Sequence, residues 1–385
     1  MESLFHPAMD ILKELEKAGY EAYIVGGAVR DHVLQRSIHD VDIATSAPSL
    51  VIKQLFPKTI DVAIKHGTVI VRHLGQSFEV TQFKGSSLLE DLKFRDFTMN
   101  AMAFSNKREI IDPYCGVQDI EKQLVRAVKS AKNRFVEDPL RMLRAIRFVS
   151  NLSFSIEEQT LEEIKNCGNQ ICNVAIERIA VELEKIWLGK SVEKAFDIFF
   201  ETKILTYIEQ LTPVQMALSD RKIVTALKKL TDATEVWTLL LFASKQQEAS
   251  NFLLQWKLSN KLIAEVELIL SRLMPILKQG FNLEDYYYFG LETCKKAERV
   301  RAAFLDEEAD LIGIEVAYKQ LPIKERKDLA LKGNDVALWL QKEDPKSKIG
   351  QLIAIAEKAV VTKKVENEKS AIINLLRREG FIDAK

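Results

Sequence analysis

The sequence predicts a mixed α+β region over about residues 1–122, followed by an all-α remainder that reaches residue 385. Two observations support this division. Before about residue 125, short alternating or apolar runs bounded by turn residues are typical of strands mixed with helices. After it, apolar residues recur at helical spacing, as in 177–187, where one apolar stripe is made by Ile179, Leu183, Ile186 and Trp187.

The strand-like runs all lie in the first region. We expect strands at about residues 21–25, 40–44, 59–62, 67–73, 77–83, 100–104 and 109–111. A helical run from near Ala28 to Gln35 lies between the first two. The chain contains no internal repeat and no low-complexity segment.

Length and composition are those of a globular protein with a sizeable core. A chain of 385 residues predicts two or more domains, and its 47% hydrophobic content is ordinary. No run approaches the roughly 20 apolar residues of a membrane span, and the first residues lack the pattern of an export signal. We therefore expect a cytoplasmic protein without a membrane partner.

The cysteines and histidines do not predict a zinc site. The cysteines have no metal-ligand spacing, and all five histidines lie at or before His73. Reduced, free thiols are the expected state of Cys115, Cys167, Cys172 and Cys294.

Charge is balanced over the chain but not locally. The formal net charge is +0, which argues against strong sequence-independent binding of long nucleic acid. Residues 121–150 nevertheless carry eight basic residues against three acidic ones. Two further basic clusters, at 324–327 and 363–364, are as readily explained as solvated helix faces.

Two aspartates one residue apart are the first candidate site. In an extended strand alternate side chains share a face, so Asp40 and Asp42 would point together while Val41 and Ile43 face the core. Two carboxylates on one face can hold a pair of Mg²⁺ ions, the metals that phosphoryl and nucleotidyl transfer use. Glu79, on the polar face of the strand at 77–83, is the best candidate for a third carboxylate, although it could be a plain exposed strand residue.

A glycine pair precedes these aspartates. Without Cβ atoms, Gly26 and Gly27 allow the backbone to approach a phosphate, and the helix that follows offers free N–H groups. Arg30 adds a positive charge there. A turn followed by solvated strand ends is the alternative, but the order and spacing of glycines, arginine and aspartates favour a nucleoside triphosphate site.

A second candidate site lies at 137–141, with the sequence Glu-Asp-Pro-Leu-Arg. Asp138 suits a helix N-cap and Pro139 the first helical position. The aspartate is also an acceptor and Arg141 a planar donor, so the pair can copy the hydrogen-bonding edge of a guanine and bind cytosine. Adenine can be met by the same pair after a small reorientation.

Together these motifs resemble bacterial class II tRNA nucleotidyltransferases, the family of CCA-adding, CC-adding and A-adding enzymes and poly(A) polymerases. The resemblance rests on the motifs at 26–31, 40–45, 95–101, 111–116 and 137–141, in that order. It is dense over about 1–190 and weaker to the end of the chain. It implies an α+β catalytic head at 1–122, a neck at 123–190 that recognises the base, a helical body at 191–258 and a tRNA-binding helical tail at 259–385.

The resemblance also implies roles for individual residues. Arg95 and Asp96 match the ribose-recognition motif, where a surface ion pair is the alternative, and Asn100 of the same motif joins the nucleotide-binding set. Asp138 and Arg141 match the protein template that selects the base. Arg144 and Arg147, which recur along the same helix, would contact phosphates or be ordinary helix-surface charges. The implied partners are CTP, possibly ATP, and the acceptor end and elbow of tRNA.

The chain departs from the family pattern at three places. Phe94 stands where many relatives have a second basic residue, and Cys115 replaces a glycine whose position would strain a cysteine if it needs a positive φ. Between Phe83 and Arg95, relatives that add CCA carry a flexible loop rich in Arg, Asp and Pro, which helps to re-aim the template from CTP to ATP. Here a short connection leads directly into a helical run from Leu88.

The missing loop favours a CC-adding enzyme that stops before the terminal A. A complete CCA-adding enzyme with a shortened loop is the main alternative, since loops tolerate deletion, natural or engineered. A poly(A) polymerase would be expected to have a more basic C-terminal extension. A non-catalytic RNA-binding relative would have no physical need for the carboxylate cluster.

Overall fold

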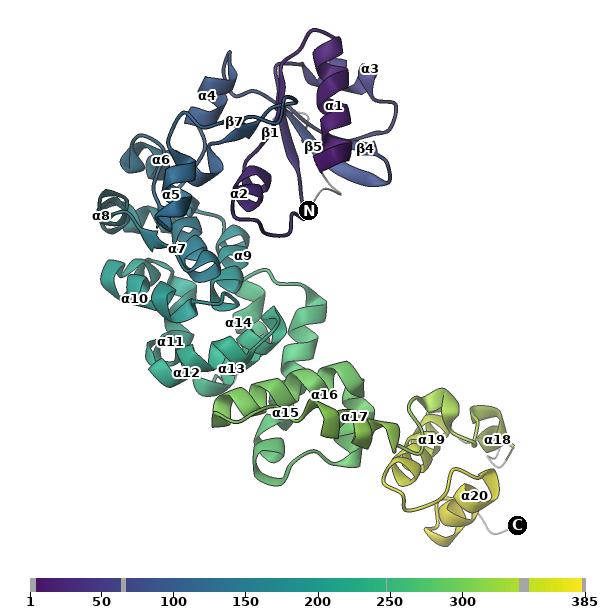
Figure 1. Cartoon of the computed structure of the whole chain (residues 1–385). Coiled ribbons are helices and arrows are strands. Elements are labelled where there is room, and N and C mark those ends of the chain that lie inside the picture. The colour runs from purple at the N-terminus through teal and green to yellow at the C-terminus, as the bar shows by residue number, and fades with distance from the viewer. Residues whose placement is uncertain (1–4, 64–66, 247, 339–345, 383–385) are drawn as a thin grey trace. The chain divides into compact units, whose positions relative to one another are not determined.

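A computed structural model describes residues 5–63, 67–246, 248–338 and 346–382 (Figure 1). The chain divides into two compact units, Met1–Thr212 and Pro213–Lys385. The first contains a mixed sheet and helices, and the second is helical. The predicted order, an α+β region followed by an all-α region, is confirmed.

A mixed sheet forms the N-terminal part of the first unit (Figure 1). Its described strands pair in the order β3-β4-β5-β2-β1-β6-β7, and β2 with β5 is the one parallel pair among them. The strands are β1 (Ala22–Val25), β2 (Asp42–Thr45), β3 (Thr59–Ala63), β4 (Thr68–His73), β5 (Gln76–Gln82), β6 (Ala103–Phe104) and β7 (Ile110–Ile111).

Short helices surround this sheet. Alternation along the strands buries Ile24, Ile43, Val69 and Phe78, and α1 packs against β1, β2 and α3. The helices up to residue 121 are α1 (Phe5–Lys17), α2 (Gly27–Val33), α3 (Ser49–Leu55), α4 (Leu88–Lys93), the 3₁₀ helix η2 (Thr98–Asn100) and α5 (Gly116–Glu121).

The rest of the first unit is helical apart from a small parallel pair, β8 (Leu124–Val125) with β9 (Ser155–Ile156). The predicted apolar stripe of α9 is buried, because α9 packs on α7. These elements are α6 (Ala131–Glu137), α7 (Leu140–Leu152), α8 (Glu158–Cys167), η3 (Gly168–Asn173), α9 (Ile176–Trp187), α10 (Val192–Thr202), η4 (Ile204–Tyr207) and η5 (Glu209–Val214), which runs across the unit boundary.

The apolar clusters of the second unit include one around Ile269, Phe289 and Ile314 and one around Leu331, Leu352 and Ile372. Its elements are α11 (Gln215–Ser219), α12 (Arg221–Ala226), η6 (Leu227–Lys229), α13 (Ala233–Ala243), α14 (Ala249–Gln255), α15 (Asn260–Gln279), α16 (Leu283–Leu305), α17 (Leu311–Lys319), η7 (Arg326–Asp328), α18 (Gly333–Ala337), α19 (Lys346–Val361) and α20 (Lys369–Arg378).

Three local predictions need correction. Strand β2 begins at Asp42, so Asp40 lies just before the strand instead of within it. The strand expected at 100–104 is shorter, because residues 98–100 form a 3₁₀ turn. Helix α7 begins at Leu140 with Pro139 as its cap residue, one position later than predicted, although Pro139 already has helical dihedrals and the Asp138 carboxylate accepts the Leu140 N–H at 3.3 Å.

Cys115, at a position where relatives have a glycine, adopts the left-handed backbone conformation, with φ 60° and ψ 36°. It precedes α5, and the Asp112 carboxylate holds this turn by accepting the N–H groups of Gly116 and Val117 at 2.7 and 2.9 Å. Gly116 is required here, since a Cβ would lie 2.3 Å from the carbonyl oxygen of Thr98. The side-chain acceptor keeps the turn closed despite the strained cysteine.

Candidate functional site

One cavity of about 690 Å³ in the first unit collects every predicted site residue. The central strands β1, β2 and β5, together with η2, α2 and the start of α7, contribute to its wall. The predicted residues that line it are Gly26, Gly27, Arg30, Asp40, Asp42, Glu79, Arg95, Asp96, Asn100, Asp138, Arg141, Arg144 and Arg147. Residues separated by more than a hundred positions in the sequence therefore share one cleft.

The three predicted carboxylates lie near the start of β2, where Glu79 of the neighbouring β5 is beside Asp42. Asp42 and Glu79 are direct neighbours in the parallel pairing of β2 with β5, and Asp40 precedes β2. Asp42 is half-buried, while Asp40 and Glu79 are exposed. Burial raises the pKa of Asp42, nearby Glu79 and Asp40 raise it further, and the charge of Arg95 opposes them.

The acidic groups of the cleft fall into two sets. Asp91 pairs with Arg95, Asp96 with Arg144 and Asp138 with Arg178. In the part of the chain that the structure describes, Asp40, Asp42 and Glu79 form no ion pair, so their charges repel one another. Such a donor set fits a divalent cation, which prefers carboxylate oxygens, although no three of these side chains within the described ranges already lie at metal-binding positions.

The glycine pair makes room for a close approach of the side chains around it. Gly26 has φ 72°, and a Cβ there would lie 3.1 Å from Nη1 of Arg95 and 3.6 Å from Oδ2 of Asp42. Helix α2 begins at Gly27 and carries Arg30, which donates to Asp31 twice and to Oδ1 of Asn100 at 2.9 Å. Arg30 is thereby fixed in the cleft wall.

Asp96 is buried and fully occupied by donors of the protein. One carboxylate oxygen accepts the Phe97 N–H and the Asn100 side-chain amide at 2.8 and 3.0 Å. The other accepts Nε and Nη2 of Arg144 at 2.9 and 2.6 Å. Burial alone would raise the pKa of Asp96, but Arg144 and these hydrogen bonds outweigh it and hold the pKa below its usual value.

Arg141 and Asp138, the predicted template pair, line the same cleft, and each is held by its surroundings. Arg141 donates to Glu137 at 2.6 Å and to the carbonyl oxygens of Arg134 and Phe94 at 3.2 and 2.9 Å. Asp138 accepts Nη2 of Arg178 at 2.8 Å. The two side chains thus have defined orientations before any base is bound.

Sequence reasoning missed two residues on α9 that complete this site. Arg178 lines the cleft and orients Asp138. Glu182, buried and 3.1 Å from Nη1 of Arg147, is also 3.9 Å from Nη1 of Arg144. The sequence did contain a signal for Glu182: it lies three residues after Ile179 and four before Ile186, which places a charged residue on the buried apolar stripe of α9.

Three protein families match successive parts of the chain. Residues 22–126 match the poly A polymerase head domain, residues 153–214 the RNA and SrmB-binding site of polymerase A, and residues 228–376 the tRNA nucleotidyltransferase domain 2. Their order agrees with the resemblance found in the sequence motifs.

Curated relatives cover almost the whole chain. A CCA-adding enzyme of Geobacillus kaustophilus is 40% identical and one of Anoxybacillus flavithermus 37% identical, each over 97% of this chain and 96% of the relative. A crystal structure of the Bacillus stearothermophilus CCA-adding enzyme in complex with CTP has 38% identity and a TM-score of 0.88, and covers 98% of both chains.

The site and these matches define a nucleotidyltransferase of the class that acts on RNA 3′ ends. The chain belongs to the bacterial class II tRNA nucleotidyltransferase family, and it is a tRNA nucleotidyltransferase. Across the described ranges, no helix is both long and apolar enough to span a membrane.

We expect Glu182→Gln to lower the free energy of unfolding by about 3 kcal/mol, since it leaves Arg147 without its buried counter-charge. Urea unfolding followed by circular dichroism measures the change. Glu162→Gln is the matched control, because Glu162 forms only an exposed pair with Lys165 and should change stability by less than about 1 kcal/mol. Equal stabilities of the two variants would contradict the assigned role of Glu182.

Proposed function

We propose that this enzyme adds two C residues from CTP to the 3′ end of tRNA in the cytoplasm and stops before the terminal A. One observation carries the proposal: strand β5 ends at Gln82 and α4 begins at Leu88, so residues 83–87 alone connect them. In CCA-adding relatives, as the sequence resemblance implies, this connection contains the flexible loop.

The connection is closed by hydrogen bonds of its own. Glu90 accepts the N–H and the hydroxyl of Ser86 at 2.6 and 2.9 Å, and Oδ1 of Asp91 accepts the Lys84 N–H at 2.9 Å. Gly85 takes φ 99°, a left-handed value open to glycine. These contacts tie the connection directly to the first turns of α4.

The other end of α4 holds the template arginine. The carbonyl oxygen of Phe94, which caps α4, accepts Nη2 of Arg141 at 2.9 Å. The carbonyl of Lys93 accepts Arg134 at 3.2 Å, and the Arg134 guanidinium lies 5.7 Å from the centre of the Phe94 ring. A template anchored to a helix with a short, closed connection has little freedom to turn from cytosine to adenine.

The lengths of the alignments agree with a deletion in this chain. The match to the Geobacillus kaustophilus relative extends over 392 residues, more than the 385 of this chain, although it covers 97% of it. Relatives therefore carry residues that this chain lacks.

The residues of the cleft divide the work of the reaction. Asp138 and Arg141 would form hydrogen bonds with the edge of cytosine. The ribose of the nucleotide would be positioned by Arg95, Asp96 and Asn100. The phosphates would be surrounded by Gly26, Gly27, Arg30, Arg144 and Arg147. Asp40 and Asp42 would hold Mg²⁺, with Glu79 as the third carboxylate. When bound, the metal would neutralise phosphate charge and favour attack by the RNA 3′-oxygen.

The helical segments would deliver the RNA. We assign residues 123–190 to base recognition and 191–258 to a helical body, and expect residues 259–385 to bind the tRNA elbow. The complete CCA-adding activity is the alternative, favoured by the names of the relatives at 37–40% identity.

Asp42→Asn should reduce C addition roughly a thousandfold, since a lost metal ligand removes several kcal/mol of transition-state stabilisation. Single-turnover addition from CTP measures the rate, and filter binding shows whether tRNA affinity is retained. Asp61→Asn, at an exposed position of β3, is the control and should be neutral. A rate near that of the unaltered enzyme would remove the metal assignment.

Arg141→Ala should weaken the preference for CTP over UTP far more than Arg178→Ala. The pair of Arg178 with Asp138 is exposed and worth at most about 1 kcal/mol, so its loss should change the kcat/KM ratio about fivefold at most. Arg141→Ala removes a donor that would face the base, and it should also leave triphosphate affinity nearly unchanged. Full discrimination in the Arg141 variant would show that the template lies elsewhere.

The main proposal is tested by product length. A tRNA that ends at the discriminator base is extended with CTP alone, ATP alone and both, and we expect two added C residues with no terminal A. Insertion of a relative's loop between Gly85 and Leu88 should restore some A addition, whereas a Gly-Ser insertion of equal length should not. Complete CCA ends from the unaltered enzyme, made at a rate near that of C addition, would establish the alternative.

A further inference from the structure

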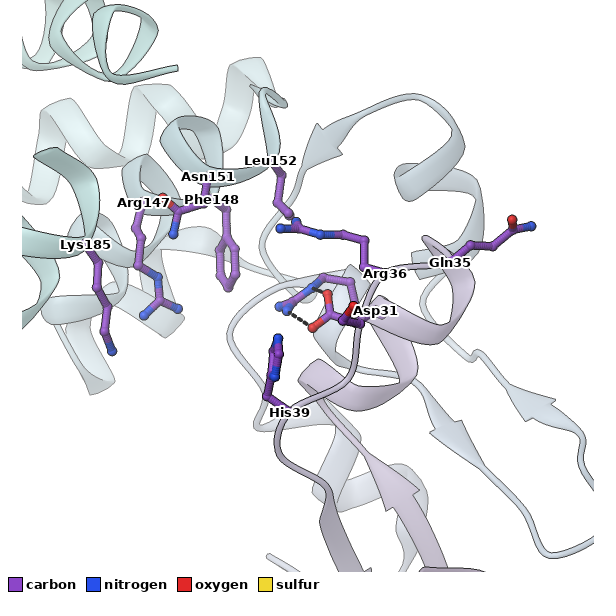
Figure 2. Close-up of a pocket in the computed structure, with 11 residues that line it drawn as sticks. Asp31, Gln35, Arg36, His39, Arg147, Phe148, Asn151, Leu152 and Lys185 are labelled. Atoms are coloured by element: carbon purple, nitrogen blue, oxygen red, sulfur yellow. Dashed lines mark hydrogen bonds and ion pairs between the residues drawn. The ribbon is translucent and has the colours of Figure 1, made fainter. Parts of the chain in front are cut away.

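A second cavity, of about 590 Å³, adjoins the nucleotide cleft in the same unit (Figure 2). Its wall comes from α2 and residues 35–39 on one side, and from α7 and α9 on the other. Four cations line it, namely Arg30, Arg36, Arg147 and Lys185, whereas Asp31 is the one acidic residue in the lining. A cavity with this charge suits a small, highly charged anion.

The two cavities are separated by a wall that is itself cationic. Arg30, Arg147 and Phe148 line both. The guanidinium groups of Arg30 and Arg147 lie 5.2 and 4.8 Å from the centre of the Phe148 ring. An anion that moves from the nucleotide cleft into the second cavity would therefore remain in contact with cationic side chains.

Arg36 and Lys185, the two cations that line only this second cavity, are available to a ligand. Figure 2 shows Arg147 and Lys185 on one side of the pocket, while Arg36 and His39 enter from the opposite side. Arg36 and Lys185 are exposed, and neither has an ion-pair partner within the described ranges. Burial lowers the pKa of Arg147, its ion-pair partner Glu182 raises it, and the cationic neighbours Arg144 and Arg30 lower it.

The chemistry of the reaction supplies an anion of the required kind. The RNA 3′-oxygen forms a new bond to the α-phosphorus, the bond between the α-phosphorus and its bridging oxygen breaks, and pyrophosphate leaves with that electron pair while the hydroxyl proton is lost to water. Attacking and leaving oxygens are in line, so RNA and pyrophosphate occupy opposite sides of the α-phosphorus. The predicted base-reading pair Asp138 and Arg141 is absent from the second cavity, whereas Arg30 and Arg147 border it.

We propose that the cavity lined by Arg30, Arg36, His39, Arg147, Phe148 and Lys185 is an exit site that receives inorganic pyrophosphate after each nucleotide addition. The inference rests on nucleotidyl transfer, and not on whether addition stops after the second C. Arg36 and Lys185 supply contacts to the departing anion only, since they do not line the nucleotide cleft.

Product inhibition tests this site. The inhibition constant of added pyrophosphate is measured on the first C addition by the wild type and by the double variant Arg36→Ala/Lys185→Ala. We expect the constant to rise about tenfold, the effect of losing a charged contact or two, with the KM for CTP nearly unchanged. Arg72→Ala/Lys190→Ala is the matched control, since both residues are exposed, lie in the same unit and line neither cavity.

Two results would overturn the exit site. An unchanged inhibition constant in the double variant would exclude pyrophosphate as the ligand. A raised KM for tRNA with a weaker salt dependence, at unchanged pyrophosphate inhibition, would identify the cavity as a site for RNA backbone phosphates. Because the assay reads only the first C addition, neither result depends on the number of nucleotides that the enzyme finally adds.

Discussion

The buried ion pair between Asp96 and Arg144 is the interaction on which the rest of the cleft depends. It joins the segment after α4 to helix α7 through two hydrogen bonds of 2.9 and 2.6 Å. Asp96 also accepts the side-chain amide of Asn100, whose Oδ1 accepts Arg30, so a continuous chain of hydrogen bonds runs from α7 to α2. Loss of one partner of such a pair would leave an uncompensated buried charge, at a cost of about 3–5 kcal/mol.

The acidic side chains of the cleft differ in whether they form an ion pair. Asp91, Asp96 and Asp138 each neutralise an arginine, which holds these guanidinium groups in fixed orientations along the wall of the cleft. The remaining carboxylates at β2 and β5 have no such partner within the described ranges, and burial together with their mutual repulsion raises the pKa of Asp42. Pairing at one end and repulsion at the other prepare the cleft for a nucleotide that carries a cation.

The sequence motifs predicted which residues line the cleft better than they predicted the contacts among those residues. The motif residues reach one cavity because each motif depends on local geometry, such as the glycine turn before α2 or the register that places Asp42 beside Glu79. The partners of Asp96 and Asp138 were not predictable in the same way, because Arg144 and Arg178 approach them from helices packed far along the chain. The family resemblance assigned Asp96 to ribose recognition, and packing adds protein donors to both of its oxygens.

The connection at 83–87 is the feature on which the proposed restriction to cytosine rests. Asp91 accepts both the Lys84 N–H and the Arg95 guanidinium, so one side chain joins the connection to a cation beside Asp42. At the other end of the same helix, the Phe94 carbonyl holds Arg141. A longer loop at 83–87 would give α4 freedom to move as a lever, and the template arginine would follow it. With the short connection, contacts at both ends of α4 favour a single state, and a nucleotide that needs the other state must break them.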